Sequence, residues 1–410
     1  MWACVYFFFV LSSYYCIKPV RDAFGLSGGD TELRWLFRAT LAVMIGVNPI
    51  FAWLVGRFPR RVFIPLTYVF FAANLLVFYV LFAATPEGES VWARRTFYVW
   101  VSVFNLFVVS VFWAFMADIF TVRQSKRLYG LIAVGGTAGA MVGASFPLLL
   151  ANRLGAANML PISIALLLAA CVCVLRLNRA MAARAAGRDD GTPPVHHGGD
   201  DRPIGGSAAA GITRVVRSPY LIGIGLFILL YTILGTLLYF QQAEIVRAAF
   251  KSDAERTAFF SRVVFLANGL TVLIQIFLTG RVLRRIGVGL TLALLPVVHL
   301  IGFSALGAST TLGLLVVFVV SRQASNYALA KPARESLFTV VKREEKYKAK
   351  NLIDTFVYRA GDAIGTVSMH ALALPLAAAW FGLALWLGRR QKELAAGEGA
   401  SGATGPAAAG

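Results

Sequence analysis

The chain is dominated by apolar stretches long enough to cross a lipid bilayer, and they recur along nearly all of its 410 residues. A helix needs about 20 such residues to span the hydrocarbon core of a membrane. Hydrophobic residues make up 58% of the chain and charged residues only 14%, against about 25% charged in a typical soluble domain. The sequence therefore predicts an all-α polytopic membrane protein with about 12 transmembrane helices. The expected spans are 1–22, 35–55, 62–84, 96–121, 128–151, 157–178, 220–243, 259–279, 286–307, 311–340, 350–369 and 371–388.

The net charge of +19 is distributed by side of the membrane rather than gathered in one patch. With both chain ends in the cytoplasm, Lys and Arg fall mostly in inner loops, such as 56–61, 123–127, 281–285 and 342–350. The loops on the other side mix their few basic residues with acidic ones. This asymmetry is the positive-inside pattern of a bacterial inner-membrane protein. It argues against a nucleic-acid surface, which would be clustered and interleaved with exposed aromatic side chains.

The start of the chain indicates a membrane anchor rather than a cleaved signal. The first residues are already apolar, with no basic segment and no cleavage site, so we expect helix 1–22 to stay in the membrane and a short cytoplasmic segment to precede it. The four cysteines lie inside apolar runs without metal-ligand spacing. We therefore expect neither a metal nor a cofactor.

A polar segment divides the apolar spans into two groups of six. Residues 179–218 are rich in Gly, Pro, Asp and Arg, which favours a flexible cytoplasmic linker. We expect six-helix bundles at 1–178 and 219–390, followed by a disordered cytoplasmic tail at 391–410.

The two halves repeat short motifs. GRFPRRVFIPLT (56–67) corresponds to GRVLRRIGVGLT (280–291), and DIFTVRQSKRLY (118–129) to SLFTVVKREEKY (336–347). Six plus six helices with a parallel repeat and a long central loop resemble the major facilitator superfamily. That resemblance implies alternating access, in which two pseudo-symmetric bundles rock about a central site.

Glycines recur at helical spacing in AVGGTAGAMVGAS. Gly135, Gly139 and Gly143 are four residues apart and share one helix face, so we expect another helix to pack closely there. A phosphate-binding loop is the alternative. It is disfavoured because no Gly-Lys-Ser/Thr follows and the segment lies within a span.

Ionisable residues inside the spans are the main functional signal. A Lys, Arg or Asp at the centre of a membrane helix costs roughly 2.5 to 3.5 kcal/mol. The ionisable residues in question lie mostly on helices one, four, seven, ten and eleven. They are eight Lys or Arg (Lys18, Arg21, Arg38, Arg262, Arg322, Lys331, Arg334 and Arg359) and six Asp or Glu (Asp22, Asp118, Glu244, Glu335, Asp354 and Asp362). Helices one, four, seven and ten line the cavity in major-facilitator proteins, as the resemblance implies. The basic surplus favours an anionic cargo, although each charge could instead form an interhelical salt bridge or snorkel to the membrane surface.

Five segments resemble the nucleotide exchange transporters, the ATP/ADP antiporters of plastids and intracellular bacteria. FWAFMADIFTVRQSKRLYGL (112–131) has their Phe-Trp-x-Phe start and Lys-Arg pair, and IKPVRDAF (17–24) resembles their Lys-x-x-Lys-Asp pattern. ARESLF (333–338) resembles their Thr-Lys-Glu segment, and FQQAEIV (240–246) holds their helix-seven glutamate. KYKAKNLIDTFVYRAG (346–361) matches their Lys-x-Lys-x-Lys-x-x-Ile-Asp segment and the Arg-x-Gly that follows it.

The resemblance implies exchange of nucleotides, with basic residues meeting the phosphates and Glu244 helping to couple the exchange. We therefore expect a small anionic substrate such as ATP or ADP, bound within the lipid bilayer. The expected substrate-binding residues are Lys18, Arg21, Asp22, Glu244, Arg322, Lys331, Arg334, Glu335, Asp354 and Arg359. The expected coupling or gating residues are Asp118, Lys126, Arg127 and Asp362.

Departures from the family pattern keep other functions open. Arg123 and Gln124 stand where the family has acids. The second hypothesis is a proton-coupled transporter of another organic anion, whose uptake would depend on a pH gradient. A membrane enzyme would need a cluster of nucleophile, base or metal ligands, whereas His299 and His370 are isolated in apolar surroundings. A receptor or scaffold that has lost transport is the fourth hypothesis.

Because the two halves supply their own interface, we expect a monomer.

Overall fold

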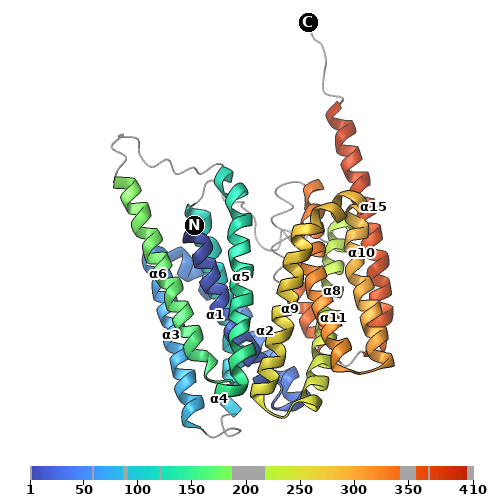
Figure 1. Ribbon diagram of the computed structural model, residues 1–410. Helices are drawn as coiled ribbons and strands as arrows, with labels where there is room; N and C mark the ends of the chain where they lie inside the picture. The colour runs from blue at the N-terminus through green and yellow to red at the C-terminus, as the bar shows by residue number, and fades with distance from the viewer. Residues whose placement is uncertain are drawn as a thin grey trace. The chain divides into compact units, whose positions relative to one another are not determined.

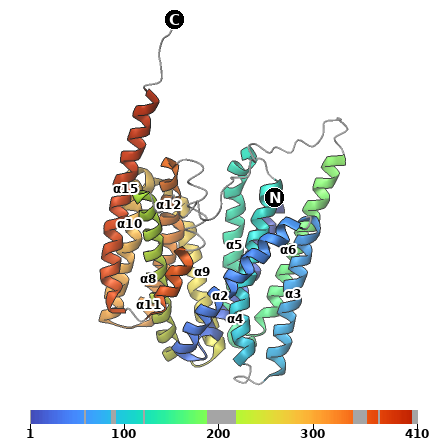
Figure 2. The same cartoon turned by 180° about the vertical axis from the view of Figure 1, so that it is seen from behind.

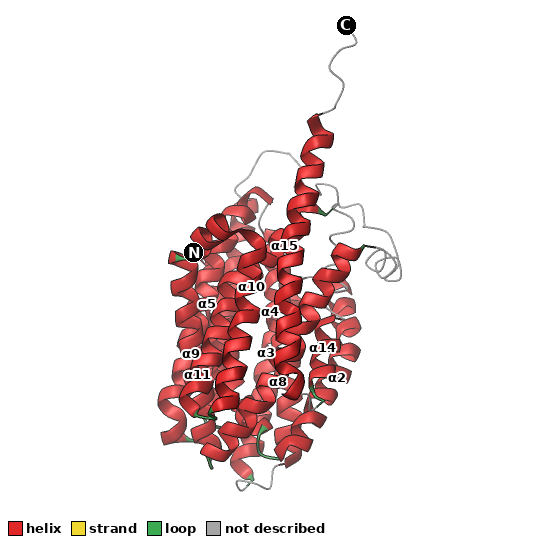
Figure 3. Ribbon diagram, turned by 90° about the vertical axis from the view of Figure 1, so that its right-hand side faces the viewer, coloured by secondary structure: helices red, strands yellow, loops and turns green. Residues whose placement is uncertain are grey.

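The computed structural model describes residues 2–57, 60–85, 91–119, 122–186, 218–341, 357–367 and 370–403 (Figure 1). Within these ranges the regular structure is helical, without strands (Figure 3). Nine of the described helical stretches are long and apolar enough to cross a membrane. The prediction of an all-α polytopic membrane protein is confirmed.

The chain divides into two compact units, one of residues 1–199 with 246–268, the other of 200–245 with 269–410. Helix α8 changes unit between Ile245 and Val246, so the first unit contains more than the six N-terminal helices. Those six are α1 (Trp2–Gly25), α2 (Gly29–Arg57), α3 (Arg60–Ala84), α4 (Val91–Ile119), α5 (Val122–Leu154) and α6 (Met159–Ala186).

From residue 218 onward the described residues form four long helices and several shorter ones. They are α8 (Pro219–Ala249), α9 (Asp253–Phe277), α10 (Thr279–Ala308), α11 (Leu312–Ser325), η1 (Asn326–Ala330), α12 (Lys331–Leu337), η2 (Phe338–Val340), α14 (Tyr358–Gly365), η4 (His370–Leu372) and α15 (Ala373–Ala403). Helix α15 continues to Ala403, where the sequence predicts an irregular tail from residue 391. Most of the predicted linker lies outside the described residues.

Helix α1 is central to the first unit and packs on α4, α5 and α6. The predicted glycine face of α5 makes the closest of these contacts. A Cβ atom on Gly139 would meet the backbone of Phe8, and one on Gly143 would meet the backbone of Ser12. The Ser12 hydroxyl donates to the Gly139 carbonyl at 2.9 Å. The predicted packing of small residues against a neighbouring helix is confirmed for this motif.

In the second unit, α10 and α15 lie side by side (Figure 2). Their approach is closest where Gly289 faces Gly388. Helix α10 is kinked at Gly287, whose φ of 77° lies in the left-handed region that glycine adopts without strain. The kink separates the basic GRVLRR segment from the apolar length of the helix, close to the predicted span start at residue 286.

The tenth predicted span is not one regular helix. Helix α11 ends at Ser325, a π turn occupies Asn326–Ala330, and α12 follows from Lys331. In the π turn the Lys331 amide donates to the Asn326 carbonyl, five residues earlier. Such turns insert one residue into a helix and often lie at functional sites.

Candidate functional site

The first unit gathers three of the predicted residues into one charged cluster on α1. Lys18 Nζ donates to Asp22 Oδ2 at 2.7 Å, and Arg21 Nη1 donates to Asp22 Oδ1 at 3.0 Å. Asp22 is only 2% exposed, whereas the two basic side chains are 27% and 16% exposed. A buried carboxylate is stable when it is paired and hydrogen-bonded on both oxygens. One carboxylate between two cations leaves the cluster with a net positive charge.

Helix α4 fixes the orientation of the Arg21 guanidinium. Arg21 Nε donates to the Tyr98 carbonyl at 3.0 Å, and Nη2 donates to the Ser102 hydroxyl at 3.2 Å. The guanidinium also lies over the Tyr98 ring, 3.9 Å from its centroid. A planar cation that is stacked and bonded in this way has a fixed orientation.

A second cluster forms in the second unit around Arg334 of α12. Arg334 is buried, and its Nη1 donates to the Tyr358 hydroxyl of α14 at 3.0 Å. The Tyr358 ring contacts Tyr231 of α8, with centroids 6.1 Å apart. Tyr231 in turn accepts a hydrogen bond from Asn326 at 3.0 Å. Among the described residues no carboxylate pairs with Arg334.

A separate ion pair lies along α14. Arg359 pairs with Asp362 at 3.6 Å, and the Thr236 hydroxyl of α8 donates weakly to Asp362 at 3.4 Å. Glycines bring these helices together, because a Cβ on Gly361 or Gly365 would meet α8. Arg359 and Asp362 therefore belong to the α8–α14 contact.

The remaining predicted residues are not all brought into these clusters. Glu244 and Lys331 are exposed, and Glu335 and Arg322 are half-buried. Asp118 lies on α4, and Lys126 and Arg127 lie on α5, but their side chains are outside the described set, as is the whole of Asp354. Within the described ranges no three His, Cys, Asp or Glu side chains could together hold a metal ion.

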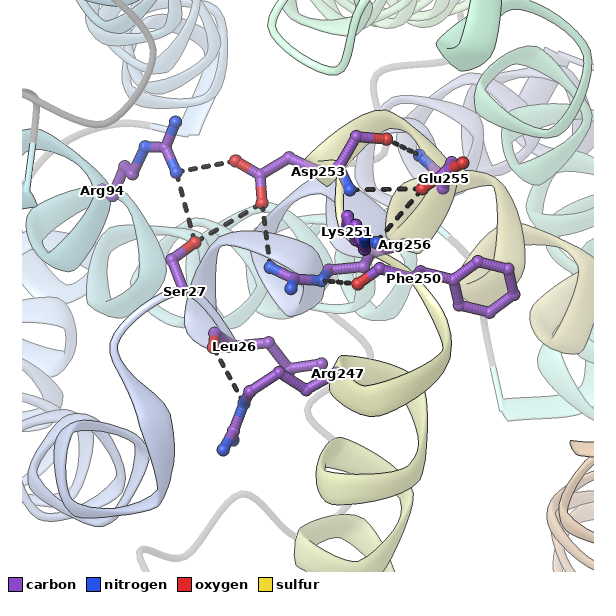
Figure 4. Close-up of polar contacts among 10 residues, drawn as sticks. Leu26, Ser27, Arg94, Arg247, Phe250, Lys251, Asp253, Glu255 and Arg256 are labelled. Carbon is purple, nitrogen blue, oxygen red and sulfur yellow. Dashed lines mark hydrogen bonds and ion pairs between the residues drawn. The ribbon is translucent and has the colours of Figure 1, made fainter. Parts of the chain in front are cut away.

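A polar clamp, defined as Ser27, Arg94, Asp253, Arg247 and Asp30, holds residues 246–268 within the first unit. Figure 4 shows Ser27, Arg94, Arg247 and Asp253 of this clamp. Arg94 Nη1 donates to Asp253 Oδ2 at 2.6 Å and to the Ser27 hydroxyl at 3.2 Å. Arg247 donates to Asp30 at 2.8 Å and to the Leu26 carbonyl at 3.2 Å. The start of α9 is thereby tied to α4 and to the turn between α1 and α2.

The replacement Asp253→Asn is expected to loosen the clamp. Arg94 and Asp253 are 14% and 15% exposed, so loss of the charge leaves a largely desolvated guanidinium with a weaker partner. Hydrogen–deuterium exchange of amides 246–260 should accelerate by about tenfold. The matched control is Asp30→Asn, whose carboxylate is 48% exposed and should contribute less because water screens it. Equal exchange in both variants would contradict this ranking.

The sequence did not predict the partners of Arg21 on α4, nor did it predict the polar clamp. The one local signal for Tyr98 and Ser102 is their spacing of four residues, which places two polar groups on the same face of an apolar helix. Arg94 and Asp253 look like ordinary loop charges, and no local pattern links them. His299, which the sequence shows as an isolated histidine, lies fully buried in α10 against Trp380.

Comparisons with known proteins agree with this architecture. Residues 34–380 match the family described as TLC ATP/ADP transporter. ADP,ATP carrier protein 1 of Chlamydia muridarum is 23% identical over 317 residues, which are 68% of this chain and 59% of the relative. ADP,ATP carrier protein 2 of Chlamydia pneumoniae is 21% identical over 439 residues, covering 89% of this chain and 80% of the relative. The chain thus spans less than two thirds of the first relative's length.

Solved structures share the fold. The nucleoside transporter NupG has a TM-score of 0.62 at 10% identity and covers 96% of this chain and 98% of its own. An auto-inhibited POT family peptide transporter has the same TM-score at 12% identity, with 96% of both chains covered. These likenesses concern the fold, which is that of major-facilitator transporters, and both family and neighbours are transporters rather than enzymes. The match over residues 34–380 covers well over half of the chain, and this integral membrane protein therefore belongs to the TLC ATP/ADP transporter family.

Proposed function

We propose that the protein is a secondary active transporter that exchanges nucleotide-like phosphorylated anions, such as ATP and ADP, by alternating access. It acts as a monomer in the bacterial inner membrane with both ends in the cytoplasm. The carrying observation is that basic side chains outnumber carboxylates in the two described clusters. Lys18 and Arg21 share one carboxylate, and Arg334 is held by a tyrosine hydroxyl.

This arrangement suits a cargo that carries several negative charges. An arginine in a membrane span is costly unless a counter-ion compensates it, and a phosphate supplies both the charge and paired acceptor oxygens. In each cluster a tyrosine ring lies beside the guanidinium, Tyr98 at 3.9 Å and Tyr358 at 5.8 Å from ring centroid to Cζ. The ring holds the cation without neutralising it; Arg21 also pairs with the Asp22 carboxylate, whereas the printed partner of Arg334 is the Tyr358 hydroxyl.

The test is uptake of radiolabelled ATP into proteoliposomes that are either preloaded with ADP or empty. We expect uptake to require internal ADP and to fall at least about tenfold in Arg334→Ala, because a buried charge-assisted contact is lost. Arg284→Ala is the matched control, since it removes an exposed arginine whose Nε donates to its own helix, at the Gly280 carbonyl.

The outcomes separate the cargo classes. Uptake that ignores internal ADP but follows an imposed pH gradient would instead support the proton-coupled transporter. An absence of uptake under every loading, from protein shown to be folded, would reject the nucleotide proposal. Equal uptake by Arg334→Ala and wild type would remove Arg334 from the binding site.

A further inference from the structure

His299 is a fully buried histidine in the second unit, and one of its ring nitrogens already forms a hydrogen bond. Its Nδ1 lies 2.9 Å from the Leu295 carbonyl, one turn earlier in α10. A carbonyl oxygen only accepts, so Nδ1 carries the proton in this bond. In the neutral ring Nε2 is then a hydrogen-bond acceptor.

Three buried polar atoms close to this ring lack a partner among the described residues. They are His299 Nε2, Arg322 Nε and Trp380 Nε1. The rings of His299 and Trp380 are 5.1 Å apart in an edge-to-face arrangement, and Arg322 is close enough to interact electrostatically with His299. One acceptor is thus enclosed with two donors. Buried polar groups of complementary kind are stable only when they satisfy one another.

The position of Arg322 connects this group with the cationic cluster. Its Nη1 lies 3.6 Å from where a Cβ would stand on Gly235 of α8, an ordinary contact distance, so the guanidinium lies against this turn of α8. One turn further along its own helix, Asn326 bonds to Tyr231, which lies one turn before Gly235 on α8. Arg322 is therefore placed beside the Tyr231–Asn326 contact, which leads through Tyr358 to Arg334.

We propose that His299 is a positioning residue for Arg322: the two side chains are not bonded to each other in this structure, and when an anion binds, Nε2 accepts the Nε proton so that both Nη groups point to the anion. This inference rests on the proposed transport of a phosphorylated anion. No carboxylate pairs with Arg322 in the described part of the chain. A carboxylate there would orient the guanidinium but also cancel its charge. A neutral imidazole orients it and leaves the full positive charge for a phosphate or carboxylate group.

Three replacements of His299 separate the acceptor from the ring. His299→Phe keeps an aromatic ring against Trp380 and Phe318 but removes the acceptor. His299→Gln has an oxygen near the place of Nε2, and His299→Asn has its polar group near Nδ1 instead. We expect the KM for ATP in ADP-driven exchange to rise about tenfold in the Phe and Asn variants, with Vmax changed by less than about twofold. The Gln variant should remain close to wild type.

A double-mutant cycle tests whether the effect passes through Arg322. In an Arg322→Gln background, His299→Phe should produce no further rise in KM. A further tenfold rise in that background would overturn the proposal, because His299 would then act elsewhere. So would a wild-type KM in the Phe variant, or a KM in the Gln variant that is as poor as in the Phe variant.

A binding measurement keeps this inference separate from the proposed cargo. Tripolyphosphate is used as the probe, and its effect on the melting temperature of the detergent-solubilised full chain is measured. If wild type exchanges no nucleotide, the proposed function fails. Stabilisation by tripolyphosphate that is lost in the Phe variant and kept in the Gln variant would still support the positioning role. Stabilisation equal in all variants, or absent from wild type, would overturn it.

Discussion

Replacement of Asp22 by alanine is expected to destabilise the protein by about 3 to 5 kcal/mol, the usual cost of removing one partner from a buried ion pair. Asp22 is the carboxylate that both Lys18 and Arg21 contact, at 2.7 and 3.0 Å. Without it, two positive groups remain next to one another inside α1 with no negative charge on that turn. The melting temperature of the purified protein in detergent should fall by several degrees.

Two further variants test whether the destabilisation comes from the loss of the Asp22 charge. Asp22→Asn keeps an acceptor and a similar volume, so it should lower the melting temperature less than Asp22→Ala. Adding Lys18→Met to Asp22→Ala removes one of the two repelling charges and should recover part of the loss. A melting temperature unchanged in Asp22→Ala would show that the cations are already compensated by other groups.

The second large effect is expected at Gly139. In Gly139→Leu the new side chain would overlap the backbone of Phe8, which cannot move as a flexible side chain could. Overpacking usually costs about 1 to 3 kcal/mol, and we expect the upper end or more because the Ser12 bond to the Gly139 carbonyl is lost as well. Size-exclusion chromatography after detergent extraction should show much less monodisperse protein.

Ala138→Leu is the matched control for this change. Ala138 is the neighbouring residue of α5 and is exposed on the outer face of the helix. The same leucine there should leave the yield and the melting temperature near those of wild type. If both variants behave alike, the close approach of α1 and α5 is not what stabilises the first unit.

Much of the fold could be predicted because the membrane imposes a minimum apolar length on every span. Span 157–178 corresponds to α6, and span 220–243 lies within α8, although both helices extend further in the structure. The extensions carry charged residues, such as Arg179 and Arg184 among the alanines of 179–186, and hydrophobic length does not detect them. The glycine face of α5 was also predictable, since residues four apart necessarily share one side of a helix.

The geometry of the site could be predicted only in part. Lys18 and Asp22 are one helical turn apart, so their contact follows from the sequence. The Tyr98 and Ser102 contacts to Arg21 join residues 77 and 81 positions apart, and they depend on how α1 and α4 are rotated against one another. That rotation is set by side-chain packing across the interface. The clamp escaped prediction for the same reason.

The π turn at Asn326–Ala330 was likewise invisible to the sequence pattern, because no residue type marks it. Its five residues are uncharged, and an α-helical pattern runs through them. Only the backbone shows that Lys331 bonds back to Asn326 rather than to the following residue.

Because of this π turn, the direction of the side chains that follow it depends on the number of residues in the turn. One added residue rotates everything after it by about 100° about the helix axis. Arg322 precedes the turn and Arg334 follows it, so their relative direction depends on this single insertion. Deletion of one residue would restore a regular helix and turn Arg334 away from Tyr358. A change of chain length, harmless in a surface loop, would here redirect a charge without altering any charged residue.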